Sequence, residues 1–331
     1  MSNPILEPRA DQAEIQIDVS LRPKSLTDFI GQPRLKQSLE LALSAAKSRG
    51  EPIDHVLLYG PPGLGKTTLA HIIASVQGGN IHVTTGPALT RAGDLASLLT
   101  NLEAGDILFI DEIHRLNKVV EETLYSGMED QRLDLVLGKG PAARTVAIDL
   151  QPFTLVGATT RYGALSGPLR SRFGIINKLE YYSPDDLAHI LTRSANILKI
   201  KLDPEAGSEL ARRSRGTPRI ANRLLRRSRD TAQIHHQGHL SLSAIVETVK
   251  LLEIDELGLD ASDRDLLTHI IKHHRGGPVG VETLASALSE DVGTIEEVYE
   301  PFLIQQGLLA RTKGGRVVTD LAYTHLGLKR S

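Results

Sequence analysis

Residues 60–68 of the chain have the types and spacing of a phosphate-binding loop. They read GPPGLGKTT, which fits the pattern G-x-x-x-x-G-K-[ST]. In that pattern the glycines let successive backbone N–H groups point at a triphosphate, the lysine reaches the outer phosphates and the hydroxyl holds Mg²⁺. The pattern therefore predicts a nucleotide site that includes Gly63, Gly65, Lys66, Thr67 and Thr68.

The acidic pair Asp111 and Glu112 is a second candidate for chemistry. It directly follows the apolar run 107–110, and such a run is typical of a strand buried on both faces of a parallel sheet. Open α/β sheets bind ligands at the carboxyl ends of their strands. Nucleotide hydrolysis needs a held Mg²⁺ and a water molecule in line with the phosphoryl group. We expect Asp111 to support the Mg²⁺ together with Thr67, and Glu112 to polarise the water.

The segments around the loop are those that such a site requires. An apolar run at 55–59 predicts a buried strand, and apolar residues at helical spacing over 67–76 predict a helix. That helix would direct its unpaired N–H groups and the positive end of its dipole at the phosphates. Further strands are predicted at 80–84, 106–112, 153–160 and 175–182. Together they indicate an α/β fold with a parallel sheet, and they disfavour the alternative of a surface turn with an exposed lysine.

Segment 132–150 breaks the alternation of strands and helices. Apolar and polar residues alternate on either side of the sequence GKGP at 138–141, which predicts a β-hairpin. A hairpin inserted into a parallel α/β unit either projects from the body or covers an edge of the sheet. The sequence leaves both possibilities open.

Composition limits the class of protein. At 331 residues the chain is too long for a single compact core. Hydrophobic residues make up 40% and charged residues 24%, as in soluble globular proteins, and the absence of cysteine excludes disulfides and thiolate metal sites. No apolar run is long enough to span a membrane, and the N-terminus lacks the features of a signal peptide. We therefore expect a cytoplasmic protein with no membrane contact.

The pattern changes along the chain in a way that predicts separate domains. A Ser-Pro helix start at 183–184 opens a run of helices, and three helices after about residue 256 precede a predicted two-stranded wing. The predicted parts are a flexible arm at 1–20, a large nucleotide-binding domain at 21–182, a small helical domain at 183–254 and a winged-helix domain at 255–331.

Charge is distributed unevenly over the last two domains. The third helix of the winged-helix domain carries five acids over 290–300 and no Lys or Arg, so phosphate would repel it. The wing carries Arg311, Lys313 and Arg316 and no acid over 301–319. We expect Arg311 and Arg316 to hold a DNA backbone without reading bases. Eight further arginines lie between 211 and 230, and a solvated or inter-subunit face is favoured over direct contact with nucleic acid.

Longer stretches of the sequence resemble a known family. The segments GPPGLGKT, FIDE, GATTR and PLRSRFG are similar to those of AAA+ ATPases. From Leu21 to Gly327 the chain resembles the RuvB family of bacterial Holliday-junction branch-migration ATPases, through LRPKSLTDFIGQ, DEIHRL, GKGPAAR, RSRGTPRIANRLLRR and EPFLIQQGLLART. The resemblance implies a P-loop AAA+ core with an inserted hairpin, an all-α lid and a C-terminal winged-helix domain.

The resemblance also implies roles for residues outside the two motifs. Leu21, Arg22 and Tyr182 correspond to contacts around the base and sugar, and Glu129, Asp130 and Gln131 to further nucleotide contacts. Thr160 corresponds to a polar sensor beside the γ-phosphate, Arg172 to an arginine finger given to the neighbouring subunit's ATP, and Arg219 to a second sensor on the lid. A guanidinium suits both arginine positions because its fixed donors match phosphate oxygens. The chain departs from the family in having Gln131 where an aromatic or apolar residue is usual, and in lacking a proline at 125–127.

The function implied by the resemblance is an ATP-dependent DNA motor. It would form a homohexameric ring on double-stranded DNA, bind ATP with Mg²⁺, and drive branch migration of Holliday junctions with RuvA, which would dock on hairpin 132–150. A clamp loader or protein remodeller with the same ATP site is the alternative enzyme. A winged-helix transcription regulator is a third possibility, but it would require a basic recognition helix, and the helix here is acidic.

Overall fold

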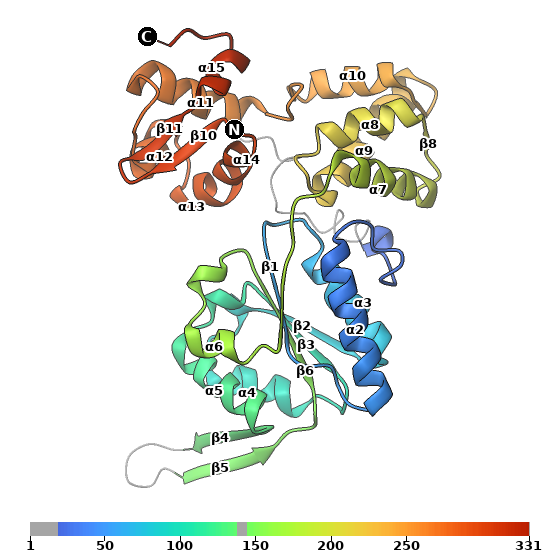
Figure 1. Ribbon diagram of the computed structural model, residues 1–331, viewed down its shortest axis with the longest axis vertical. Coiled ribbons are helices and arrows are strands. Elements are labelled where there is room, and N and C mark those ends of the chain that lie inside the picture. The colour runs from blue at the N-terminus through green and yellow to red at the C-terminus, as the bar shows by residue number, and fades with distance from the viewer. Residues whose placement is uncertain (1–18, 138–143, 331) are drawn as a thin grey trace. The chain divides into compact units, whose positions relative to one another are not determined.

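The computed structural model describes residues 19–137 and 144–330 (Figure 1). Residues Arg22–Tyr182 form one of two compact units, and the described residues on either side of that range form the other. Within the described ranges, no helix has the length and apolar character needed to cross a membrane.

A sheet of five parallel strands lies at the centre of the first unit. In spatial order its strands are β2 (Ile81–Thr85), β3 (Ile107–Asp111), β6 (Thr154–Thr159), β1 (Val56–Tyr59) and β7 (Ile175–Lys178). All of β6 and the first four residues of β3 are buried, which confirms the predicted sheet covered on both faces. β7 is shorter than predicted, because its partner β1 ends at Tyr59, where the glycine loop begins.

Helices cover both faces of this sheet. They are α2 (Pro33–Arg49), α3 (Lys66–Gln77), α4 (Ala92–Thr100), α5 (Lys118–Glu129) and the short α6 (Gly167–Ser171). In Figure 1, α2 and α3 lie on one side of the strands and α4, α5 and α6 on the other. Leu95 of α4 and Leu124 of α5 pack with Leu108 and Leu155 of the sheet in one core. These two layers hold the carboxyl ends of the strands in place.

The predicted hairpin consists of β4 (Arg132–Leu137) and β5 (Arg144–Asp149). The two strands pair only with each other and not with the central sheet. Figure 1 shows them extending away from the body of the unit, with buried Leu133 anchoring the base in the core beside α5. Of the two possibilities that the sequence left open, the projecting hairpin is therefore the correct one. Residues 138–143, which include the predicted turn at 138–141, lie outside the described residues.

The second unit begins with a bundle of four helices. They are α7 (Pro184–Ile197), α8 (Pro204–Arg212), α9 (Pro218–His235) and α10 (Leu242–Leu251). The predicted start at Ser183 is confirmed, since the Ser183 hydroxyl accepts a hydrogen bond from the Asp186 N–H at 3.1 Å. Two-residue strands β8 (Lys201–Leu202) and β9 (His239–Leu240), which periodicity did not predict, pair in parallel beside the helices.

The rest of this unit is the winged-helix fold. Its elements are α11 (Ala261–His274), α12 (Val281–Leu288), a continuous helical stretch of α13 (Val292–Thr294), η5 (Ile295–Tyr299) and α14 (Glu300–Gln305), then β10 (Leu309–Thr312), β11 (Gly315–Val318) and α15 (Asp320–His325). β10 and β11 form the predicted wing, in which Arg311 lies opposite Arg316. Helix α15, which follows the wing, was not expected from the sequence.

Candidate active site

The loop between β1 and α3 needs glycine for steric reasons. Gly60 has φ +143°, and a Cβ on it would lie 2.5 Å from the carbonyl oxygen of Leu179 on β7's continuation. Gly65 has φ +102°, and a Cβ there would lie 3.1 Å from the Phe29 ring. L side chains rarely adopt such φ values; the approach at Gly60 leaves no room for a Cβ, and the approach at Gly65 is tight. The glycines of the motif therefore allow the loop to turn tightly at the start of α3.

Lys66 is a buried cation at the centre of this loop. It is 7% exposed, and its ammonium donates hydrogen bonds to the carbonyl oxygens of Gly60 at 2.8 Å and Pro61 at 2.9 Å. It is also the first residue of α3, where the helix dipole adds positive potential. Phosphate oxygens can replace these carbonyls as acceptors, so the loop has the charge and donors of an anion site.

Strand order brings the predicted catalytic segments to one edge of the sheet. β6 lies between β1, which leads into the loop, and β3, which ends in Asp111. The Gly60 N–H donates to the Thr159 carbonyl at 3.1 Å, so the end of β6 contacts the loop directly. Next to it, the Thr160 hydroxyl is buried and has no hydrogen-bond partner among the described residues. A buried hydroxyl without a partner is uncommon, and its position beside the loop suits a ligand oxygen.

The acidic pair at the end of β3 has an unusual backbone. Asp111 accepts a hydrogen bond from the Glu112 N–H at 3.0 Å, and Glu112 has φ +51°, a left-handed conformation that is strained for glutamate. A Cβ on Gly86 would lie 2.4 Å from the Glu112 carbonyl oxygen, so the neighbouring segment packs tightly against this turn. The acidic pair therefore lies in a tightly packed turn at the carboxyl end of β3.

Three family models match successive parts of the chain. The Holliday junction DNA helicase RuvB P-loop domain matches residues 21–179, the RuvB AAA lid domain 182–255 and the RuvB C-terminal winged helix domain 256–327. The structure resembles that of Thermotoga maritima RuvB, a Holliday junction branch migration motor, with TM-score 0.86 and 54% identity over 94% of this chain and 99% of that one. A point variant of the same Thermotoga protein matches with TM-score 0.87 and 54% identity over 93% of this chain and 99% of that one.

The chain belongs to the RuvB family. It is thus an AAA+ P-loop ATPase of the helicase type, in a family of Holliday-junction branch-migration motors that bind nucleotide and DNA. The fold predicted from the sequence is confirmed in all its parts: the P-loop core with its hairpin, the helical lid and the winged-helix domain.

The RuvB-family residues predicted to contact base and sugar lie in different surroundings. The Tyr182 hydroxyl, on a side chain that is almost fully buried, donates to the Leu64 carbonyl of the phosphate loop at 3.1 Å. Burial, together with the positive charge of Arg22, lowers the pKa of His71, which places Arg22 near α3. Leu21 belongs to the other compact unit, where its carbonyl accepts from Arg193 of α7 at 2.7 Å. Arg219 lies in the first turn of α9 in that same unit.

Arg172 is held at the ends of α5 and α6. Its guanidinium donates to the Glu129 carboxylate and to the Pro168 carbonyl, both at 2.8 Å, and lies 4.3 Å from the centre of the Tyr125 ring. Its Nε is buried without a hydrogen-bond partner in the described chain. The structure therefore brings together Arg172 and Glu129, two residues that the RuvB resemblance had assigned separately to nucleotide contact.

His114 is a candidate that the sequence prediction missed. Its side chain is 5% exposed, with Nε2 3.5 Å from a Glu112 carboxylate oxygen and Nδ1 2.9 Å from the Thr159 hydroxyl. The Thr159 oxygen also accepts from the Arg161 N–H, so a hydroxyl that donates to Nδ1 leaves Nε2–H to face the carboxylate. A histidine two positions after the acidic pair was visible in the sequence, but its partner on β6 was not.

The wing of this RuvB-family chain differs from the sequence prediction in its charge. Arg311 pairs with Glu296, and Arg316 donates to Glu300 at 2.6 Å and to Glu296 at 2.9 Å. The Arg311 side chain remains 53% exposed and that of Arg316 only 8%. Burial by itself would lower the pKa of Arg316, but its bonds to Glu300 and Glu296 raise it above the ordinary value. Acids of the third helix thus neutralise wing arginines that were predicted to be free for DNA.

Proposed function

We propose that the protein is an ATP-driven motor that forms a hexameric ring on duplex DNA and moves Holliday junctions together with RuvA. The observation that carries the proposal is the meeting of the phosphate loop, the acidic pair and the orphaned Thr160 hydroxyl at one sheet edge, in a chain of the RuvB family. Such a motor works on chromosomal DNA, so we infer that it acts in the cytoplasm. We also infer that it works as three domains, 21–182, 183–254 and 255–331, preceded by an arm at 1–20.

The roles at the sheet edge follow from chemistry. Backbone N–H groups of Gly63, Gly65 and Thr68 and the Lys66 ammonium bind the phosphates, because both kinds of donor gather at the start of α3. Thr67 and Asp111 would hold Mg²⁺, which when bound neutralises charge on the phosphates. An acid that ends a buried strand at the same edge of the sheet as the phosphate loop suits this task. Glu112 accepts a proton from the attacking water, and Thr160 donates to the γ-phosphate.

Other residues complete the nucleotide site in the proposal. Leu21, Arg22 and Tyr182 surround the base and sugar, and Arg219 approaches the phosphates from the lid. Support comes from the hydrogen bond between Tyr182 and the loop residue Leu64.

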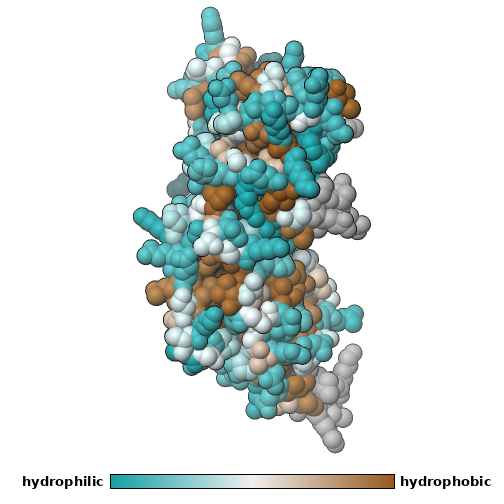
Figure 2. Space-filling model, turned by 90° about the vertical axis from the view of Figure 1, so that its right-hand side faces the viewer, coloured by the Kyte–Doolittle hydropathy of each residue, from teal (hydrophilic) through white to brown (hydrophobic). Residues whose placement is uncertain are grey.

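The proposed ring completes each ATP site across a subunit interface. Arg172, which pairs with Glu129, would face the neighbour's γ-phosphate, and Glu129, Asp130 and Gln131 would supply further nucleotide contacts. All of the hydrogen bonds described for Arg172 are to α5 and α6 residues, and none is to its own phosphate loop. Figure 2 shows hydrophobic residues gathered on one face of the nucleotide-binding unit. Exposed apolar patches of this kind mark protein interaction sites, which supports contact between subunits.

His114→Ala is expected to lower kcat for ATP hydrolysis about tenfold while leaving KM nearly unchanged, since the contact of Nε2 with the Glu112 carboxylate at 3.5 Å is lost and a tenfold change in rate corresponds to about 1.4 kcal/mol. In this proposal the imidazole acts by positioning Glu112, so the loss would fall on the chemical step. His82→Ala serves as the matched control, because His82 also pairs with an acid, Asp106, at 3.0 Å on the same sheet. A His114→Ala enzyme with parental kcat, measured by phosphate release, would remove His114 from the mechanism.

Arg311→Ala and Arg316→Ala are both expected to weaken duplex binding to the same extent for every DNA sequence. Arg311 would contact the backbone directly, and the buried Arg316, held by Glu300 and Glu296, would position the wing strand. Arg311, the more exposed of the two, would exchange Glu296 for a phosphate oxygen. Its replacement by alanine should reduce the slope of log K for DNA binding against log salt concentration by about 1. Arg316→Ala should also lower the melting temperature, since it leaves the buried Glu300 with only the longer contact to Arg311 at 3.9 Å. Fluorescence anisotropy on two unrelated duplexes over a salt series tests this, with the exposed Arg330→Ala as control. Unchanged binding by Arg311→Ala would rule out the wing as the DNA contact.

The function itself is tested by ATP-dependent movement of a synthetic four-way junction with and without RuvA. We expect movement by the parent, stimulated by RuvA, and loss of that stimulation when the outer part of hairpin 132–150 is replaced by a two-residue turn. ATPase activity without RuvA should stay within about twofold, because β4 and β5 pair only with each other. RuvA stimulation that survives the shortening would place the docking site elsewhere, and a parent that never moves junctions would contradict the motor function.

A further inference from the structure

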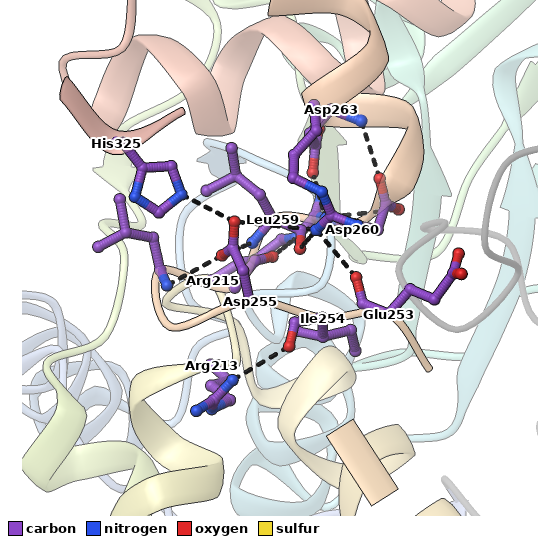
Figure 3. A network of polar contacts seen from close by, with 12 residues as sticks. Arg213, Arg215, Glu253, Ile254, Asp255, Leu259, Asp260, Asp263 and His325 are labelled. Atoms are coloured by element: carbon purple, nitrogen blue, oxygen red, sulfur yellow. Dashed lines mark hydrogen bonds and ion pairs between the residues drawn. The ribbon is translucent and has the colours of Figure 1, made fainter. Parts of the chain in front are cut away.

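Segment 252–260, which connects lid helix α10 to winged-helix helix α11, is tied to its surroundings by arginines. Arg213 of the lid donates to one backbone carbonyl in it, and Arg264 of α11 donates to two others. The acceptors are Ile254 at 3.0 Å for Arg213, and Glu253 and Leu259, both at 2.9 Å, for Arg264. Figure 3 shows this network. The connection is therefore fixed at several points and does not act as a free tether.

Arg215 of the lid lies at the centre of the network. It is 4% exposed, its Nε donates to the Gly258 carbonyl at 2.9 Å, and its Nη2 bonds the Asp263 carboxylate and lies 3.5 Å from that of Asp260. Its guanidinium carbon also lies 4.7 Å from the centre of the Phe302 ring. One lid side chain thus contacts the connecting segment, the start of α11 and helix α14.

The two carboxylates are part of the structure of α11. Asp260 accepts from the Asp263 N–H at 2.9 Å and Asp263 from the Asp260 N–H at 3.1 Å, so they form the capping box of the helix. Burial raises the pKa of Asp263 to about 7, although Arg215 lowers it. The carboxyl accepts the Arg215 hydrogen bond in either protonation state. Leaving a buried guanidinium without partners is costly, so this contact favours movement of the lid and the winged-helix domain together.

Arg215 also lies close in the chain to the residue proposed to sense ATP. Arg215 and Gly216 have φ +51° and +68° and make the turn before α9, and Arg219 lies in the first turn of that helix. A lid movement set by nucleotide at Arg219 would therefore shift Arg215 with it. Resting on the proposed function, we propose that Arg215 is a positioning residue that transmits the nucleotide state of the lid to the DNA-binding winged-helix domain.

The test uses the double variant Arg215→Met with Asp263→Asn, which removes the guanidinium and leaves a neutral capping oxygen at the start of α11. Its matched control is Arg227→Met with Asp230→Asn, which removes an ion pair of 3.1 Å on the surface of the same helix α9. DNA affinity and ATPase activity without DNA should stay within about twofold of the parent, since the substitutions alter neither the proposed DNA contact on the wing nor the proposed nucleotide site. Stimulation of the ATPase by DNA, and junction movement per ATP, should fall about tenfold in the double variant only.

A second measurement does not depend on activity. Calorimetry of the full chain should show the lid and winged-helix domain unfolding together in the parent and in the control, and separately in the double variant, with protease cleaving within 252–260 only in the double variant. If the double variant does not fold, Arg215→Lys replaces it in the test. This substitution keeps the buried charge but loses the fork of donors, and it should lower the stimulation of the ATPase by DNA about threefold. The inference would be overturned if these variants kept the parental stimulation of the ATPase by DNA and unfolded the lid and the winged-helix domain in a single transition. A parent that unfolds as described but moves no junctions would instead contradict the proposed function.

Discussion

Lys66→Ala is expected to lower the rate of ATP hydrolysis about a thousandfold and to abolish junction movement, because a preorganised charge at the phosphates is lost. The buried ammonium already lies among the loop carbonyls of Gly60 and Pro61, so it needs little rearrangement to meet phosphate oxygens. Phosphate release and four-way-junction assays on the same preparations measure both effects.

The Lys66→Ala protein should still fold, since the hydrogen bonds from the ammonium to Gly60 and Pro61 lie in the loop and the strands of the sheet pair through their own backbones. Lys47→Ala, at the exposed end of α2, is the matched control and should behave as the parent. Circular dichroism and melting temperature distinguish loss of chemistry from loss of folding. Junction movement by a folded Lys66→Ala protein would refute the hydrolytic mechanism.

Arg172→Ala is expected to reduce ATP hydrolysis by about 10³-fold or more, the effect typical of a missing arginine finger. The stability cost should be small, because its partner Glu129 has a side chain that is 56% exposed and can be solvated. Arg170→Ala is the control, since Arg170 lies on the short helix α6 that ends beside Arg172, and its guanidinium carbon likewise lies over an aromatic ring, 5.4 Å from the centre of Tyr162.

Mixing distinguishes a finger that acts in the neighbouring subunit from one that acts in its own. Arg172→Ala and Lys66→Ala subunits should each be nearly inactive alone. In mixed rings, however, an intact phosphate loop can meet an intact Arg172 from its neighbour, and part of the ATPase activity should return. Mixtures that form joint oligomers, as shown by co-purification of two tags, yet stay as inactive as their components would exclude the trans arrangement.

Local sequence was sufficient for the parts of the site that are continuous in the chain. The phosphate loop and the acidic pair depend on residue types within a few positions of each other, and the strands and helix that carry them show in the apolar pattern. The wing was predicted on the same basis. The sequence alone therefore indicated the fold class and the family. It did not indicate β8, β9 or α15, because these elements are short and leave little periodicity.

Contacts between distant segments were decided only by the tertiary structure. The sequence shows which charged residues the wing has, but it could not show that Glu296 and Glu300 pair with Arg311 and Arg316. It placed His114 near Glu112 but not against Thr159, 45 residues away on another strand.

The arginine-rich segment of the lid illustrates the same limit. Its composition favoured a solvated or inter-subunit face, yet Arg215 is buried against Asp263, 48 residues further on. A charge in the sequence has no partner until the chain folds, and its partner and its burial together determine whether it binds a ligand, stabilises the fold or links two domains. The sequence determined which residues this protein has for phosphate chemistry, and only the packing of its strands and helices determined which of its charges are available for it.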